Sequence, residues 1–163
     1  MADLAEIDCG GQSAVLREAT LADVPELVAL LAADQLGASR DGIADETDLA
    51  AYRAAAAAID GDPAHLLVVA EVAGLAAGTI QLSFLPGLAR RGALRAQIEA
   101  VRVAPAARGG GLGAAMMTWA IDEARRRGCA LVQLTSDKSR SDAHRFYQRL
   151  GFTATHEGMK LKL

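Results

Sequence analysis

Cysteine is scarce in this chain of 163 residues, which contains only Cys9 and Cys129. Two thiols cannot build a disulfide framework, and no group of cysteine and histidine residues has the spacing of metal ligands. The sequence therefore predicts that no metal is bound. Cys129 lies between an expected helix and an expected strand, where a small buried thiol is the ordinary interpretation.

Long apolar runs and an excess of positive charge are also missing. No run approaches the roughly 18 residues that a membrane-spanning helix needs. The start of the chain, M-A-D-L-A-E-I-D, lacks the basic and apolar regions of a signal peptide. The formal net charge is -3, whereas nucleic-acid binding generally needs a basic surface. We therefore expect a cytoplasmic protein that binds neither nucleic acid nor a membrane.

Glycine is concentrated in one stretch, residues 97–114, with the sequence Q-I-E-A-V-R-V-A-P-A-A-R-G-G-G-L-G-A. Its first half predicts a strand that ends near Ala104, because Pro105 cannot donate to a sheet ladder. Its second half places glycines at the start of an expected helix, namely Gly109, Gly110, Gly111 and Gly113. Glycine leaves backbone N–H groups accessible, and the helix dipole favours an anion there, so this stretch predicts a site for a phosphate-bearing ligand.

Two other interpretations of these glycines are open on spacing alone. The first is a plain turn without a ligand, which is costly in chain entropy. The second is a dinucleotide site, since Gly109-x-Gly111-x-x-Ala114 fits that fingerprint and Asp137 follows the next expected strand. Against it, residues 104–108 separate the glycines from their strand, and the chain is too short for a doubly wound parallel sheet. A P-loop is excluded because no Gly-Lys-Ser/Thr follows.

The motif Arg108-x-x-Gly111-x-Gly113 resembles the R/Q-x-x-G-x-G/A signature of the GCN5-related N-acetyltransferase (GNAT) superfamily. Downstream, residues 143–152, A-H-R-F-Y-Q-R-L-G-F, resemble the A-x-x-x-Y-x-x-x-G-F segment of that family. In the family, the glycine loop holds the pyrophosphate of acetyl-coenzyme A. The resemblance covers residues 13–163, which we expect to form a single domain. Residues 1–12 are expected to be a loose lead-in.

Periodicity and turn residues predict the order β-α-α-β-β-β-α-β-α-β-β, a mixed α/β sheet with helices on both faces, as in the GNAT fold. The expected strands are 14–19, 65–72, 76–85, 97–104, 130–135, 152–155 and 159–163. The expected helices begin at Thr20 and at Thr47 or Asp48, cover 112–127, and begin again at Ser141 or Asp142.

The resemblance implies which residues hold acetyl-CoA as co-substrate. The backbone of the strand would hydrogen-bond the pantetheine amides like an added strand, and the loop would hold the pyrophosphate. The implied binding residues are Val101, Arg102, Val103, Arg108, Gly109, Gly110, Gly111, Leu112, Gly113, Ala114, Ser141 and Phe146. The sequence departs from the family at Arg140, where many members carry Asn, so Ser141 or Arg140 itself is expected to replace that contact.

Glu99 and Tyr147 are the candidate catalytic residues. Glu99 lies within an apolar strand and is either a carboxylate on a solvated face or a general base whose pKa is raised by burial. Several GNAT enzymes carry Glu at the matching place, which favours the base. Tyr147 has helical spacing typical of core packing, while the resemblance implies that its phenol protonates the departing coenzyme A thiolate.

The sequence therefore predicts an acetyl-CoA-dependent N-acetyltransferase that moves the acetyl group directly to a small primary amine. The alternatives are a non-catalytic acyl-CoA-binding module and an enzyme that acetylates a protein amine. The fold implies an acceptor site at residues 35–47 and 86–95. The first range carries Asp41, Asp45 and Glu46, and the second carries Arg90, Arg91 and Arg95, which would hold a carboxylate or phosphate. The arginines could equally be solvated loop charges. Assembly as a homodimer is also open.

Overall fold

The computed structural model describes residues 3–34 and 36–163. It contains two compact units, Met1–Gln133 and Leu134–Leu163, which we describe separately. The first unit holds most of a six-stranded sheet and its flanking helices. The second unit holds a short helix and the C-terminal segment.

The sheet has the strand order β1-β2-β3-β4-β5-β6. Each neighbouring pair from β1 to β5 is antiparallel, whereas β6 follows β5 through a helical crossover, so the sheet is mixed. The strands are β1 Asp3–Cys9, β2 Gln12–Glu18, β3 His65–Val72, β4 Leu75–Pro86, β5 Leu94–Val103 and β6 Leu131–Leu134. The expected mixed α/β class is confirmed.

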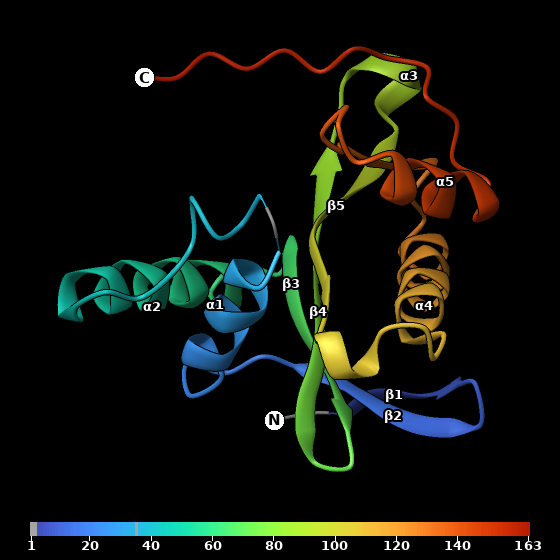
Figure 1. Ribbon diagram of the computed structural model, residues 1–163. Coiled ribbons are helices and arrows are strands. Elements are labelled where there is room, and N and C mark those ends of the chain that lie inside the picture. Colours follow the sequence, from blue (N-terminus) through green and yellow to red (C-terminus); the bar gives the residue numbers. More distant parts are fainter. Residues whose placement is uncertain (1–2, 35) are drawn as a thin grey trace. The chain divides into compact units, whose positions relative to one another are not determined.

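Helices of the first unit cover both faces of this sheet (Figure 1). On one face, α1 (Val24–Ala32) packs against β4 and β5, and α2 (Glu46–Asp60) packs against β3. On the other face, α4 (Leu112–Arg126) packs against β1, β4 and β5. Two short helices, α3 (Ala89–Gly92) and the 3-10 turn η1 (Pro105–Ala107), flank β5 at its two ends.

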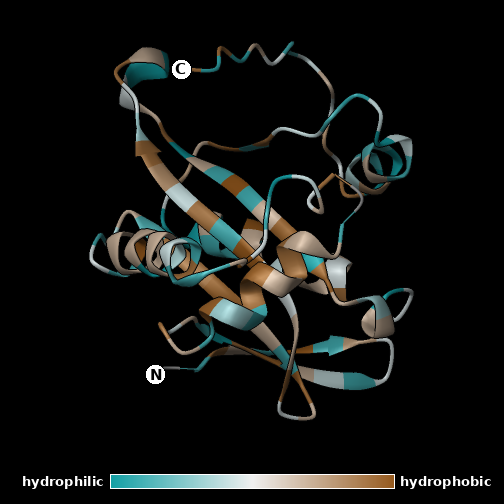
Figure 2. Ribbon diagram, turned by 60° about the vertical axis from the view of Figure 1, so that its left-hand side comes forward, coloured by the Kyte–Doolittle hydropathy of each residue, from teal (hydrophilic) through white to brown (hydrophobic). Residues whose placement is uncertain are grey.

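Alternating side chains on the central strands form the core, as the striped colouring of the long strands in Figure 2 shows. Val68, Ile80 and Leu82 are completely buried. Met116 of α4 is also completely buried, and it approaches Gly78 so closely that a Cβ there would lie 2.8 Å from its Sδ. Gly78 therefore lets α4 sit directly on the backbone of β4.

The expectation of a loose lead-in over residues 1–12 is wrong for Asp3–Cys9, which forms β1 and pairs with β2 in antiparallel register. Gly10 and Gly11 close this hairpin with φ values of 66° and 89°. Such a two-residue turn needs positive φ at both positions, which glycine adopts without strain. The Cys-Gly-Gly sequence is therefore a hairpin turn; residues 1–2 lie outside the described residues.

Two helix starts also differ from the expectation. Asp23, not Thr20, occupies the N-cap position of α1, and Asp45 caps α2 by accepting from the N–H groups of Thr47 and Asp48 at 2.9 and 3.0 Å. Asp45 caps α2 because its backbone is extended, as a cap requires. The carboxylate of Asp23 is instead engaged by neighbouring residues.

In the second unit, α5 spans Ser141–Arg149, and Arg140 occupies its N-cap position. The strands expected at 152–155 and 159–163 are absent, because neither segment forms a ladder with another described strand. Alternation sets which side chains share a face, but a strand also needs a hydrogen-bonding neighbour. Among the described residues, no helix is long and apolar enough to cross a membrane.

Candidate active site

A β-bulge interrupts the pairing of β4 with β5. Thr79 lies opposite Arg102 and Gln81 lies opposite Glu99, so Ala100 and Val101 together face the single residue Ile80. Ala100 adopts φ of 53°, which is unusual for a residue other than glycine. A bulge leaves one residue outside the regular ladder and is common beside active sites. The bulge lies next to Glu99 and at the start of the expected pantetheine-binding backbone, Val101–Val103.

The glycine loop leads from β5 into α4. Gly109 and Gly111 have φ of 83° and 85°, and Gly111 is the N-cap residue of α4. No side chain caps this helix start, and a Cβ at Gly109 would meet nothing within 4 Å. The Nε of Arg108 donates to the carbonyl of Val103 at 3.1 Å, which ties the loop to the end of β5. The first N–H groups of α4 are therefore accessible to an anion.

The hairpin turn of β1 and β2 supports this loop. A Cβ at Gly10 would lie only 2.8 Å from the carbonyl oxygen of Gly110, so the two backbones approach closely. Sequence reasoning missed this contact. The Gly10-Gly11 pair was its only signal, and it gives no indication of which segment the turn meets.

Arg95, Gln97 and Glu99 lie on one face of β5, because they alternate with the buried Ala96 and Ile98. This set pairs with Leu85, Ser83 and Gln81 of β4. The other β4 face is the one toward α4, since it carries Gly78 under Met116 and Phe84 under the Arg127 guanidinium, 4.0 Å from the ring centroid. The polar set therefore faces the α1 and α2 side. We call Arg95, Gln97 and Glu99 the polar face of β5.

The side chain of Glu99 is exposed at this position. Of the two interpretations of Glu99, its exposure fits the carboxylate on a solvated face and not a pKa raised by burial, because alternation places it on a part of the sheet that the helices leave open. Its role as a base stays a prediction. Gln97 is the neighbour of Glu99 on the polar face. The amide of Gln133, at the edge of the sheet, donates to Gln97 Oε1 at 2.7 Å and so fixes this side chain. Sequence reasoning missed Gln97 and Gln133.

Arg95 has no polar partner for its buried Nε among the described residues. One of its terminal nitrogens, Nη1, lies 3.4 Å from where a Cβ of Gly87 would be, so glycine makes room for the guanidinium. A buried donor without a partner costs about 1–3 kcal/mol of stability.

Arg90 and Arg91 lie within α3 and are both exposed. They adopt φ of 55° and 61°, so this short loop is folded tightly. No carboxylate of the described residues pairs with either guanidinium. Both arginines thus follow β4 in the chain. They come a few residues before Arg95, the first residue of the polar face.

The connection between α1 and α2 forms a hollow of about 690 Å³. Tyr52 organises it: its hydroxyl donates to Asp41 Oδ1 at 3.3 Å and accepts from the N–H of Gly42 at 3.2 Å. Asp45 is occupied by capping α2, while Glu46 in the first turn is exposed. The residues that line the hollow are 38–44, Asp48, Ala51, Tyr52 and Ala55. Sequence reasoning missed Tyr52, whose signal was a single phenol beside an alanine run.

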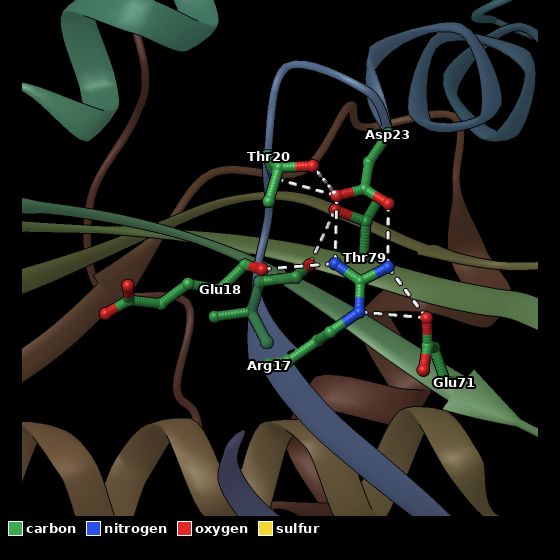
Figure 3. Close-up of polar contacts among 7 residues, drawn as sticks. Arg17, Glu18, Thr20, Asp23, Glu71 and Thr79 are labelled. Carbon is green, nitrogen blue, oxygen red and sulfur yellow. Dashed lines mark hydrogen bonds and ion pairs between the residues drawn. The ribbon is translucent and has the colours of Figure 1, made fainter. Parts of the chain in front are cut away.

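An ion cluster fixes the start of α1 to the sheet (Figure 3). Arg17 of β2 binds both oxygens of Asp23 at 2.7 and 2.8 Å and Oε1 of Glu71 on β3 at 2.7 and 2.8 Å. Thr20 donates its N–H and hydroxyl to Asp23 at 2.7 and 2.8 Å. Hydrogen bonding from Arg17, stronger than the opposing effect of burial, lowers the pKa of Asp23 to about 2. The cluster positions α1 and the loop that follows it.

The second unit carries the remaining predicted residues. The ring of Tyr147 meets the edge of Phe146 at a centroid distance of 5.2 Å and that of Phe152 at 6.0 Å. The Phe152 N–H donates to the carbonyl of Tyr147 at 3.1 Å. Tyr147 is half-buried and packs against these two rings, while the role of its hydroxyl stays a prediction. Ser141 is the first residue of α5.

The sequence pattern of the acetyltransferase (GNAT) family matches residues 28–152 of this chain. The chain belongs to the GNAT acetyltransferase family. The matched range includes the bulge, the glycine loop and Tyr147, so the expected resemblance is confirmed.

Individual GNAT relatives match in part or over nearly the whole chain. An aminoalkylphosphonate N-acetyltransferase of Salmonella typhimurium is 40% identical over 37% of this chain and 39% of its own length. A glucosamine 6-phosphate N-acetyltransferase of Trypanosoma brucei brucei is 36% identical over 55% of this chain and 59% of its own length. The match therefore spans less than two thirds of either relative. A solved structure described as a transcriptional regulator from Bacillus halodurans C-125 is 43% identical, covers 92% of this chain and 99% of its own, and has a TM-score of 0.87.

Proposed function

We propose that this protein transfers the acetyl group of acetyl-CoA directly to the primary amine of a small acceptor that also carries an anionic group. The observation that carries the proposal is the bulge at Ala100 and Val101, followed at once by a glycine loop that opens the uncapped start of α4. A thioester carbonyl needs backbone donors that lie outside a ladder. A pyrophosphate needs N–H groups at the start of a helix.

Acetyl-CoA would supply the activated acetyl group as a thioester. The backbone of Val101–Val103 would bind its pantetheine amides as an added strand. The loop from Arg108 to Ala114 would bind its pyrophosphate, with the glycines leaving room for phosphate oxygens. The accessible space at Gly109 and the uncapped start of α4 fit this assignment. Ser141 and Phe146 are assigned to the coenzyme by the family resemblance alone.

Proton transfer is assigned to Glu99 and Tyr147. An amine must lose a proton to become a nucleophile, and Glu99, at the bulge and on the open polar face, would accept it directly or through water. The Tyr147 hydroxyl would donate a proton to the departing thiolate. A backbone N–H at the bulge would donate to the thioester oxygen as negative charge develops on it.

The acceptor would bind on the α1 and α2 side, where the polar face of β5 lies. The two GNAT relatives act, by name, on amines that bear a phosphonate or a phosphate, which supports an anionic acceptor. Arg90 and Arg91 would attract the anion. Asp41 and Glu46 would attract the ammonium, whereas Asp45 is engaged in capping α2.

Binding of acetyl-CoA tests the coenzyme site directly. A ligand that binds only the folded protein raises its melting temperature, by an amount equivalent to about 2.7 kcal/mol when its concentration is 100 times Kd. We expect this rise for acetyl-CoA in the unsubstituted protein and its loss in Gly109→Val, where a side chain enters the loop. Gly128→Val is the matched control, since Gly128 has φ of 78° and equally open space at the far end of α4. Stabilisation by NADH and not by acetyl-CoA would establish a dinucleotide site instead.

A non-catalytic acyl-CoA-binding module is the second candidate, favoured by the description of the Bacillus halodurans neighbour as a regulator. Release of coenzyme A thiol in the presence of small primary amines separates the two. Turnover with any amine establishes the enzyme. Stabilisation by acetyl-CoA without thiol release across amines and lysine-bearing peptides establishes the module, and release with peptides alone establishes a protein acceptor.

A further inference from the structure

We infer that Gln97 donates a hydrogen bond to an oxygen of the acceptor, and that this oxygen is bonded to the carbon next to the amine-bearing carbon. The protein would then select 1,2-amino alcohols, the arrangement that amino sugars contain. The inference deepens the proposed function and rests on it for the position of the reacting amine at Glu99. It concerns a substituent beside the amine and not the anionic group of the acceptor.

Gln97 lies beside the position proposed for the reacting amine. Gln97 and Glu99 are on the same face of β5, with the buried Ile98 between them. Two residues of extended strand separate their Cα atoms by about 7 Å. The two side chains are equally long and stand roughly perpendicular to the sheet, so their polar ends reach a similar height. Two hydrogen bonds of about 3 Å each take up most of this gap. A nitrogen and an oxygen on adjacent carbons therefore fit between them.

The amide of Gln97 is oriented by a neighbour at the edge of the sheet. Gln133 Nε2 donates to Gln97 Oε1 at 2.7 Å, so the amide oxygen is engaged there. The amide nitrogen makes a long contact of 3.5 Å with the carbonyl oxygen of Ile98, the residue that precedes Glu99. An amide nitrogen carries two hydrogens. At least one N–H of Gln97 therefore remains for an oxygen of a ligand on the polar face.

Gln97 belongs to a row of polar side chains that is held in place. Ser83 lies directly opposite Gln97 on β4, and His65 lies opposite Ser83 on β3. The Ser83 hydroxyl and Nδ1 of His65 are 2.8 Å apart, so Ser83 has a partner other than Gln97. The row is thus fixed from β3 by His65 and from β6 by Gln133. A donor that is already ordered loses little rotamer freedom when it binds a ligand.

A fixed amide donor discriminates through the ligands that leave it unpaired. Gln97 is half-buried, and an acceptor with a methylene in place of the oxygen would cover its N–H without accepting from it. An amide donor that loses its water and gains no partner weakens binding. The side chain of lysine has only methylenes next to its amine, so the same donor disfavours a lysine of a protein acceptor.

The test compares two pairs of amines, each with equal numbers of non-hydrogen atoms, on the whole chain with acetyl-CoA. Ethanolamine and propylamine differ by an oxygen close to the amine, whereas 5-aminopentanol and hexylamine differ by an oxygen far from it. Thiol release gives kcat/KM for each amine, and each pair gives a ratio of the oxygen-bearing to the oxygen-free amine. The amines of a pair differ in basicity, so each ratio is compared between protein variants, which removes that difference.

Gln97→Leu should lower the ethanolamine ratio by roughly 5- to 10-fold, as the loss of one neutral hydrogen bond predicts. It should not change the aminopentanol ratio or KM for acetyl-CoA. Gln133→Leu keeps Gln97 but removes the bond that orients it, and it should lower the ethanolamine ratio by a smaller factor. Gln12→Leu is the matched control, because Gln12 is exposed at the start of β2, and it should leave both ratios unchanged. A merely structural role of Gln97 would change the rates of all four amines together and leave both ratios unchanged.

The outcomes of the inference and of the proposed function are distinguishable. An unchanged ethanolamine ratio in Gln97→Leu overturns the inference, and so does an equal fall in both ratios, while turnover of the amines leaves the acetyltransferase standing. If no amine releases thiol, calorimetry in the presence of coenzyme A gives the same ratios from Kd values. A fall of the ethanolamine ratio alone then supports the inference and overturns the proposed function. Unchanged Kd ratios, or no binding of any of the four amines, overturn the inference.

Discussion

At the scale of single residues, the role of Glu99 depends on its chemistry and not on the fold. Its side chain is exposed on β5, so replacing it should leave packing unchanged. If it accepts the proton of the amine, Glu99→Gln should lower kcat by about 100-fold or more, with KM for acetyl-CoA nearly unchanged. Steady-state kinetics between about pH 6 and 9 provide the measurement.

Glu46→Gln is the matched control for Glu99→Gln, since Glu46 is an exposed carboxylate outside the polar face. It should affect KM for the acceptor and not kcat. Full activity of Glu99→Gln across that pH range would remove Glu99 from the mechanism and leave a water chain as the base.

At the scale of elements, the bulge in β5 lies between the proposed coenzyme site and the proposed acceptor face. Ala100 holds the bulge at φ of 53°, a conformation that β-branched residues strongly disfavour. Ala100→Val should therefore destabilise the protein by about 1 kcal/mol and also lower kcat, because the backbone N–H groups at the bulge would be displaced. Chemical denaturation and steady-state kinetics measure the two effects.

The chain contains its own control for backbone strain. Ala73 has φ of 52° in the turn between β3 and β4, so Ala73→Val imposes nearly the same strain elsewhere in the sheet. It should cost similar stability and leave kcat unchanged. Equal kcat in both valine variants would mean that the bulge has no part in the chemistry.

At the scale of the first unit, the Arg17 cluster links β2, β3 and the start of α1. The pKa of Asp23 is lowered to about 2, so its folded form binds a proton less readily than the unfolded chain does. The stabilisation, about 2 kcal/mol, should be complete above about pH 4 and be lost as the pH falls toward 2. Urea unfolding across this range should show the loss in the unsubstituted protein and a flatter profile in Asp23→Asn.

Removing the cation should be more severe than neutralising one anion. Arg17→Met keeps much of the side-chain volume but leaves Asp23 and Glu71 without their partner, and it should cost about 3 kcal/mol at neutral pH. Arg125→Met, at an exposed ion pair of α4, should have little effect. Similar losses in the two variants would contradict a structural role for the cluster.

The sequence by itself determined the class of the fold, the glycine loop at the start of α4 and the family. These features are local, because each is set by residues within one short stretch of the chain. They are the Arg108–Gly113 motif, the alternation of β3 and β4, and the periodicity of α4. The motif predicted the glycine-capped helix start because only glycine accepts those φ values at low cost. The same local reasoning failed at Asp3–Cys9, which pairs with the next strand across the Gly10-Gly11 turn, and at residues 152–163, which form no ladder. Alternation within one segment does not specify whether that segment finds a hydrogen-bonding neighbour.

Only the tertiary structure decided which side chains lie on the polar face of β5. The register of β4 against β5 created the bulge, exposed Glu99 and set Arg95 and Gln97 on its face. Arg90, Arg91 and Arg95 are equivalent in sequence, yet burial beside Gly87 distinguishes Arg95 from the two exposed loop residues. Strand register and burial depend on how separate segments pack together, so no local pattern could specify which of the three arginines would be partly buried.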